Sequence, residues 1–231
     1  MPITNVVFDF GAVLAWPPSS AACERLRENA GIPKDVLMSR YFRRRAEYDH
    51  DSISAIDYWR SIVDGFPAEN DEALLARLAL MDVEAWSEPN RATVDWLPVL
   101  KDAGFVLALL SNMPGSFWDV LQHQVEWLRL FDHTVISGKV QISKPSREIF
   151  ELLLGVLACD ADEVLFLDDS EANVSAARDV GLHAEVYNAF DGGLASIAKR
   201  YSLPLPAEPQ PDPARLQDTA CAPHLSTHLP R

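Results

Sequence analysis

Short apolar runs recur along the chain and predict buried β-strands. Four of these runs are rich in β-branched or aromatic residues, and a weaker fifth follows them. The five runs lie at residues 5–8, 105–110, 133–137, 163–167 and 183–187. Segments with helical periodicity occupy the intervals at 94–104, 146–157 and 173–182. Short strands that alternate with helices are typical of a parallel sheet covered on both faces, so the pattern predicts an α/β fold with a Rossmann-like sheet.

The long interval after the first run contains helical signals and no convincing strand. Ser54 can cap a helix over residues 55–65, in which Ile56, Trp59 and Ile62 share one apolar face. A crossover between parallel strands needs only about a dozen residues, far fewer than this interval holds. We therefore expect an inserted helical domain at 17–87, between core segments 1–16 and 88–202.

The composition changes near residue 203, where proline becomes frequent and apolar positions lose their periodicity. Such segments do not bury enough apolar surface to offset the entropy cost of folding. Residues 203–231 are therefore predicted to form a disordered, proline-rich tail.

The overall charge limits the classes of partner. The formal net charge is −14, from 34 acidic and 20 basic residues, whereas non-specific nucleic-acid binding needs a basic surface. No basic N-terminal region precedes a long apolar segment, and no run approaches the roughly 20 apolar residues of a membrane span. We expect a cytoplasmic protein that acts on a small molecule and has no nucleic-acid or membrane partner. The oligomeric state cannot be inferred from these features.

Polar residues with chemical potential follow the strands at the points where the strands end. In an open parallel sheet, ligands bind beyond the carboxyl ends of the strands, so residues distant in sequence are expected to converge there. These residues are Asp9, Ser111, Asn112, Lys144, Asp168 and Asp169.

The combination of groups indicates phosphoryl chemistry. Three carboxylates in one small site repel one another strongly, and Mg²⁺, which takes oxygen ligands, relieves that repulsion. Lys144 can then place its charge on a phosphate oxygen or on Asp9, while Ser111 and Asn112 donate hydrogen bonds to other phosphate oxygens. Asp9 is left to attack phosphorus and form an aspartyl-phosphate. Catalysis would rest on positioning and charge neutralisation.

Four segments resemble, in order, the four motifs of the haloacid dehalogenase (HAD) superfamily. They are VVFDFGAVL, LLSNMP, SKPSREIF and VLFLDDSEANVSAAR. Each motif is weak alone, but four in the right order are specific, and the resemblance covers about 1–16 and 88–190. The inserted helices resemble the α-helical cap of subfamily I, and YDHDSIS followed by YW resembles a cap segment of phosphatase-like members. The resemblance implies a phosphoric monoester hydrolase.

The resemblance also implies a metal site and a nucleophile. Asp9 is expected to be the nucleophile and a Mg²⁺ ligand, and the backbone carbonyl of Gly11 a second ligand. Asp168 is expected to bind Mg²⁺, and Asp169 to support the metal shell through water.

The same resemblance implies the substrate contacts. Ser111 and Asn112 are expected to bind the transferred phosphoryl group, and Lys144 to neutralise its charge during catalysis. The substrate would be a small phosphorylated metabolite, with sugar phosphates as one candidate class, because a subset of sugar-phosphate phosphatases resembles the Asp-x-Gly pattern found here.

Gly11 departs from the pattern of the phosphatases, which usually carry there a second Asp as general acid. Three explanations remain open: the substrate has a good leaving group, a cap residue supplies the proton, or the reaction is not phosphate hydrolysis. Asp49, His50 and Asp51 are the candidate donors from the cap. The basic run Arg43–Arg45 is expected to be a solvated helix face, with the alternative that one arginine reaches an anionic substrate.

Two other functions stay open. A 2-haloacid dehalogenase would use Asp9 to displace halide from carbon without a metal, and it also lacks the second Asp. A non-catalytic module that binds or accepts phosphate would use similar groups, but its acid pair would follow the first strand rather than the fourth.

Overall fold

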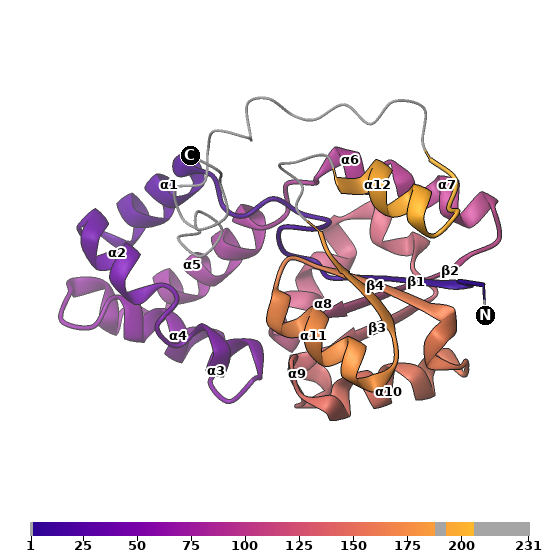
Figure 1. The fold of residues 1–231 in the computed structure, drawn as a ribbon. Coiled ribbons are helices and arrows are strands. Elements are labelled where there is room, and N and C mark those ends of the chain that lie inside the picture. Colours follow the sequence, from indigo (N-terminus) through magenta and orange to yellow (C-terminus); the bar gives the residue numbers. More distant parts are fainter. Residues whose placement is uncertain (1, 188–192, 206–231) are drawn as a thin grey trace, which may run out of the picture.

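The fold is an α/β structure built on one five-stranded parallel sheet (Figure 1). The structure is a computed structural model that describes residues 2–187 and 193–205. The strands are β1 (Asn5–Phe8), β2 (Val106–Ser111), β3 (His133–Ile136), β4 (Val164–Asp168) and β5 (His183–Val186), and their order in the sheet is β3-β2-β1-β4-β5. The predicted fold class is confirmed, and each strand lies within one residue of its predicted run. Most of the predicted tail, from residue 206 onward, lies outside the described residues.

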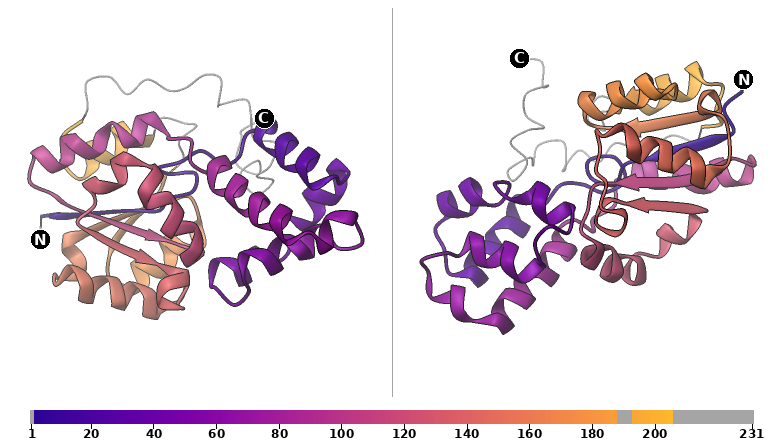
Figure 2. Two further views of the ribbon diagram at one scale, coloured as in Figure 1. Left: turned by 180° about the vertical axis from the view of Figure 1, so that it is seen from behind. Right: turned by 90° about the horizontal axis from the view of Figure 1, so that it is seen from below.

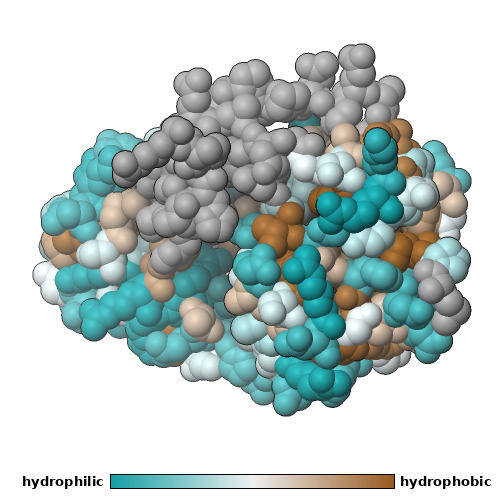
Figure 3. Space-filling model, viewed as in Figure 1, coloured by the Kyte–Doolittle hydropathy of each residue, from teal (hydrophilic) through white to brown (hydrophobic). Residues whose placement is uncertain are grey.

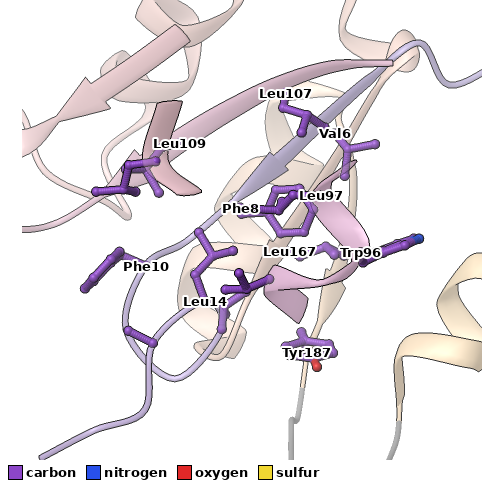
Figure 4. Close-up of a cluster of buried hydrophobic side chains, with 14 of the residues drawn as sticks. Val6, Phe8, Phe10, Leu14, Trp96, Leu97, Leu107, Leu109, Leu167 and Tyr187 are labelled. Carbon is purple, nitrogen blue, oxygen red and sulfur yellow. The ribbon is translucent and has the colours of Figure 1, made fainter. Parts of the chain in front are cut away.

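Helices cover both faces of this sheet, which explains why its strands are apolar on both sides. On β1, Val6 and Phe8 pack into one core cluster, and Val7 between them packs into another. The first cluster, shown in part in Figure 4, lies under α6 (Arg91–Val94), α7 (Trp96–Asp102), α8 (Gly115–Gln124) and α12 (Gly193–Arg200). The second lies under α10 (Arg147–Leu157) and α11 (Glu171–Val180). The central strand is therefore fixed from both sides.

The inserted segment forms a helical unit beside the sheet, with a hydrophobic core of its own (Figure 2). Its helices are α1 (Ser20–Ala30), α2 (Lys34–Arg40), α3 (Arg45–Asp49), α4 (Ala55–Ile62) and α5 (Glu72–Ala85). Ser54 caps α4 as predicted, because its side chain accepts a hydrogen bond from the Asp57 backbone N–H. The shorter elements of the chain are η1 (Pro67–Asn70), η2 (Glu126–Leu130), α9 (Ser137–Val140) and η3 (Ala161–Glu163).

The outer surface of the helical unit is mostly hydrophilic on the face shown in Figure 3. Hydrophobic patches interrupt the surface of the sheet unit in the same view. Within the ranges the structure describes, we find no helix with the length and apolar character needed to span a bilayer.

Two linkers join the helical unit to the sheet unit, and they run side by side. The Trp16 N–H donates to the Glu88 carbonyl at 2.8 Å, and the Asn90 N–H donates to the Leu14 carbonyl at 2.8 Å. The Asn90 side chain adds a hydrogen bond to the Val13 carbonyl at 2.9 Å. This pairing holds the helical unit over the carboxyl ends of the strands.

Candidate active site

Three carboxylates meet at the carboxyl ends of the two central strands. Asp9 directly follows β1, Asp168 ends β4, and Asp169 is the next residue. Phe8 and Leu167 are partners in the parallel ladder, so the residues after them emerge side by side. One oxygen of each aspartate lies within 4.8 Å of the others. The sheet register therefore gathers acids that are about 160 positions apart in the sequence.

Lys144 supplies the positive charge next to these acids. Its ammonium nitrogen lies 2.8 Å from Asp9 Oδ1 and 2.6 Å from Asp168 Oδ2, and it donates to the Leu110 carbonyl at 2.9 Å. Burial acts to lower the pKa of Lys144, but the charges of Asp168 and Asp9 outweigh it and raise that pKa above its ordinary value. The side chain is therefore a fixed cation between two acids.

Asp168 is fully buried and held by donors on both of its oxygens. Its Oδ1 accepts hydrogen bonds from the Ser170 backbone N–H and from the Asn173 side-chain amide, each at 2.9 Å, while Oδ2 accepts from Lys144. These donors fix the orientation of the carboxylate. Asn173, whose position on α11 follows the acid pair, also lines the cavity above the site.

The pKa values of the remaining two acids, Asp9 and Asp169, are raised above their ordinary values. Burial raises the pKa of Asp9 to about 6, with Lys144 opposing this effect and Asp168 adding to it. Burial, together with the charges of Asp9 and Asp168, raises the pKa of Asp169 to about 7. One ammonium group faces three carboxyl groups, so the donor set fits a hard divalent cation such as Mg²⁺, which prefers oxygen ligands. Gly11, the predicted carbonyl ligand, lines the same cavity.

The two predicted phosphate-binding residues occupy different positions in the site. Ser111 ends β2 and borders the cavity. The Asn112 side chain is instead paired with the Lys144 main chain: its Oδ1 accepts from the Lys144 N–H and its Nδ2 donates to the Lys144 carbonyl, each at 2.9 Å. The amide of Asn112 therefore positions Lys144, a function that the sequence alone did not reveal.

A cavity of about 300 Å³ lies above the acids, between the two units. The sheet unit contributes six of the predicted site residues to its walls, namely Asp9, Gly11, Ser111, Asn112, Lys144 and Asp169. The helical unit and its linker add Phe42, Arg45, Asp49 and Trp86, and Phe117 of α8 completes the apolar part of the wall. We predicted a core or cap-interface position for Trp86 and no role for Phe42 or Phe117, because nothing in a single sequence shows which face of a helix covers a distant strand end.

Arg45 is the member of the basic run that reaches the cavity. Its Nε lies 2.8 Å from Asp49 Oδ1 and its Nη1 lies 3.2 Å from Asp82 Oδ2, with Asp82 fully buried in α5. Arg44 instead forms a surface ion pair with Glu47. The prediction of a solvated helix face is therefore wrong for Arg45, because α3 forms part of the cavity wall.

The three candidate proton donors of the cap have separate environments. His50 Nδ1 lies 3.0 Å from Ser143 Oγ, and the carboxylate of Asp51 accepts from the Gly115 N–H at 3.1 and 3.2 Å. Of the three, Asp49 lines the cavity. Burial raises the pKa of Asp49 to about 6, against the opposing effect of Arg45.

Known proteins are similar in sequence to this chain over most of its length. Bifunctional epoxide hydrolase 2 of Mus musculus is 26% identical over 236 residues, an alignment that covers 95% of this chain and 43% of that protein. The chain therefore spans less than half the length of this relative. Phosphoglycolate phosphatase 1 of Pseudomonas aeruginosa is 26% identical over 182 residues, covering 78% of this chain and 61% of that protein.

Solved structures share the fold. A HAD family enzyme from Bacteroides thetaiotaomicron, solved in complex with magnesium and inorganic phosphate, matches with a TM-score of 0.65 at 19% identity and covers 79% of this chain and 93% of that chain. A family model described as haloacid dehalogenase-like hydrolase matches residues 40–181, more than half of the sequence. The chain belongs to the haloacid dehalogenase-like hydrolase family.

Proposed function

We propose that the protein is a Mg²⁺-dependent phosphatase that hydrolyses small phosphorylated metabolites through an aspartyl-phosphate. The observation that carries this proposal is the position of Lys144, whose ammonium group lies within 2.8 Å of both Asp9 and Asp168 beside a third carboxylate. A buried nucleophile surrounded by fixed charge suits a substrate that is itself highly charged, because catalysis of phosphoryl transfer consists mainly of positioning and electrostatic stabilisation. The phosphatase among the relatives supports the same class of reaction.

Each of the site residues has a defined task in this reaction. The Asp9 carboxylate attacks phosphorus, and Lys144 neutralises charge on the phosphoryl oxygens while remaining anchored to Asp168. The Ser111 hydroxyl donates to another phosphoryl oxygen. Held by Asp9, the Gly11 carbonyl, Asp168 and Asp169, Mg²⁺ would neutralise the remaining charge of the phosphoryl group. Water then hydrolyses the aspartyl-phosphate and restores Asp9.

The cavity walls limit the size of the substrate. The cavity volume of about 300 Å³ lies at the lower end of the range for ligand pockets, so the organic part of the substrate is small. Phe42, Trp86 and Phe117 offer ring surfaces against which an apolar group or a sugar ring can pack. Sugar phosphates therefore remain one class for a substrate screen.

Removal of the metal tests the proposal directly. We expect the protein to hydrolyse p-nitrophenyl phosphate in the presence of MgCl₂, and EDTA to abolish that turnover until Mg²⁺ is added in excess. The absorbance of p-nitrophenolate measures the rate. A rate unchanged by EDTA would contradict a metal-dependent phosphatase, and an absence of turnover with Mg²⁺ would favour a module that only binds phosphate.

A 2-haloacid dehalogenase is the second candidate, because Gly11 provides no carboxylate at the position where phosphatases carry a general acid. In that reaction Asp9 displaces halide from carbon and needs no metal. The cluster argues against it, since Asp169 adds a third acid that such chemistry does not use. Halide release from 2-chloropropionate in the presence of EDTA would support the dehalogenase.

Mg²⁺ binding is expected to stabilise the fold more at pH 7.5 than at pH 5.5. Without metal, the folded state holds protons on Asp9 and Asp169 more tightly than the unfolded chain, so their contribution to stability falls as pH rises from 3.8 to about 7. Mg²⁺ needs the deprotonated carboxylates, so its contribution rises over the same range. At 100 times its Kd the ion adds about 2.7 kcal/mol, or a shift in Tm of about 5–11 °C. Thermal unfolding with MgCl₂ or EDTA measures the shift.

The control for this measurement replaces MgCl₂ with KCl at equal ionic strength, which screens the charges without binding among them. We expect KCl to produce a much smaller shift in Tm at either pH. Equal shifts with MgCl₂ at pH 5.5 and pH 7.5 would show that the ion does not bind at the three carboxylates.

A further inference from the structure

We propose that Asp49 of the helical cap is the general acid that protonates the leaving oxygen of the substrate, in place of a carboxylate at position 11. This assignment rests on the proposed phosphatase function. It names the residue that completes the reaction and assigns a catalytic group to the cap.

A side chain at Gly11, two residues after the nucleophile, would press against Trp86. A Cβ atom on Gly11 would lie 3.2 Å from Cζ3 of Trp86, so the indole ring would have to shift by a few tenths of an ångström to admit it. Trp86 is itself fixed, because its Nε1 donates to the Tyr41 hydroxyl at 2.9 Å. Gly11 itself has no acidic side chain, so a proton donor has to come from another part of the cavity wall.

Asp49 is a carboxyl group in that wall with an oxygen available for the substrate. Its Oδ1 lies 2.8 Å from Arg45 Nε, and among the described residues no hydrogen bond reaches its Oδ2. The side chain is 16% exposed and borders the same cavity as Asp9. Burial raises the pKa of Asp49, Arg45 opposes this effect, and the charges of Asp82 and Asp9 add to it. The two carboxyl groups are thus on opposite units, with the substrate space between them.

The backbone at Asp49 is fastened to the sheet unit, which gives this carboxyl group a defined position. Ser137 Oγ donates to the Asp49 carbonyl at 2.5 Å, and Ser137 also accepts from the Met113 N–H at 2.9 Å. The neighbouring Asp51 adds a second attachment through the Gly115 N–H. These contacts hold the end of α3 against the segments that follow β2 and β3, at the starts of α8 and α9.

Buried Asp82 fixes the orientation of Arg45, and Arg45 in turn fixes the orientation of the Asp49 carboxyl group. Asp82 accepts from Arg45 Nη1 at 3.2 Å and from the Tyr41 hydroxyl. Because the guanidinium is held from below, it presents Nε to Asp49 in a constant direction. Arg45 and Asp82 are positioning residues in this arrangement, and Asp49 is the catalytic residue.

The proton transfer balances within one cycle. Asp9 forms a bond to phosphorus while the bond from phosphorus to the leaving oxygen breaks, and the Asp49 carboxylic acid gives its proton to that oxygen, so an alcohol departs. The Asp49 carboxylate then accepts a proton from the water that attacks the aspartyl-phosphate. Inorganic phosphate leaves, and Asp9 and Asp49 return to their initial states.

The dependence of the rate on the leaving group tests this role. Asp49→Asn is expected to lower kcat/KM for an alkyl phosphate such as glycerol 3-phosphate by about 10²–10⁴-fold, the usual contribution of a general acid. It is expected to lower kcat/KM for p-nitrophenyl phosphate far less, because p-nitrophenolate leaves without a proton. The ratio of the two values for one enzyme preparation is the measurement, and in this ratio a smaller fraction of folded protein cancels.

Glu47→Gln is the matched control, since it removes a neighbouring carboxylate of α3 that pairs with Arg44 at the surface and does not line the cavity. We expect that variant to keep the wild-type ratio between the two substrates. Equal losses for both substrates in Asp49→Asn would overturn the proposal and leave Asp49 with a structural role. Wild-type protein that hydrolyses neither substrate would instead refute the proposed phosphatase function.

Discussion

Asp9→Asn is expected to lower phosphatase turnover by a factor on the order of 10⁴–10⁶, because it removes the nucleophile. The amide oxygen of asparagine carries no negative charge and does not form the aspartyl-phosphate. The fold should remain, since asparagine has nearly the same volume and Lys144 keeps its contact with Asp168 at 2.6 Å. Turnover of p-nitrophenyl phosphate with MgCl₂ measures the loss, and circular dichroism confirms that the variant is folded.

A suitable control is Asp95→Asn, which removes an acid that is 63% exposed and lies 3.8 Å from Arg91. Exposed pairs of this kind contribute at most about 1 kcal/mol, and Asp95 does not line the cavity. That variant should keep wild-type kinetics. Normal turnover in Asp9→Asn would mean that another group attacks the substrate, and the proposed mechanism would fail with it.

The parts of the site that follow strands could be located from the sequence. Asp9, Ser111 and Asp168 come at the ends of apolar runs, and parallel strands place all such ends at one edge of a sheet. The prediction needed the strand type and the element order, both of which are encoded in local patterns. It did not need the order of strands within the sheet.

The contributions of the cap could not be located in this way. Arg45 and Asp49 lie four positions apart on a short helix, and their charged side chains look like a solvated pair until the packing of α3 is known. Trp86 is an aromatic residue in a linker, a position equally consistent with a core contact. Which of these side chains enter the cavity depends on how two separately packed units meet, and a single sequence carries no direct signal of that contact.

The role of Asn112 illustrates a different limit. Its amide follows a strand and has the right chemistry for a phosphate contact, so the sequence favours that assignment. In the structure both polar atoms of the amide bond the Lys144 backbone. A backbone partner leaves no trace in residue identity, so side-chain chemistry alone does not reveal that Asn112 supports another catalytic group.

Helix α8 was also not predicted, since it begins at Gly115 after Pro114 without a side-chain cap.

Lys144→Met is expected to have the largest effect on stability, because Lys144 is the cation between two buried acids. Removal of one partner from a buried ion pair typically costs about 3–5 kcal/mol, which corresponds to a fall in Tm of about 6–20 °C for a protein of this size. Turnover should fall by about 10²–10³-fold, as for loss of a charge-stabilising group. Added Mg²⁺ should recover part of the stability but not the turnover, since the ion neutralises the carboxylates while the charge on the phosphoryl oxygens remains missing. Thermal unfolding in EDTA and in MgCl₂, with kinetics in MgCl₂, separates the two effects.

Lys139→Met provides the comparison, because Lys139 is 45% exposed and its nitrogen lies 2.7 Å from a carboxylate oxygen of Asp119. The two substitutions delete the same charge from the same type of pair, so they differ mainly in burial. The surface pair should contribute within about 0.5 kcal/mol of zero. If Lys144→Met and Lys139→Met changed Tm equally in EDTA, the repulsion among Asp9, Asp168 and Asp169 would be too weak to require a cation. The electrostatic basis of the proposed metal site would then be wrong, even if the protein still hydrolysed phosphate esters.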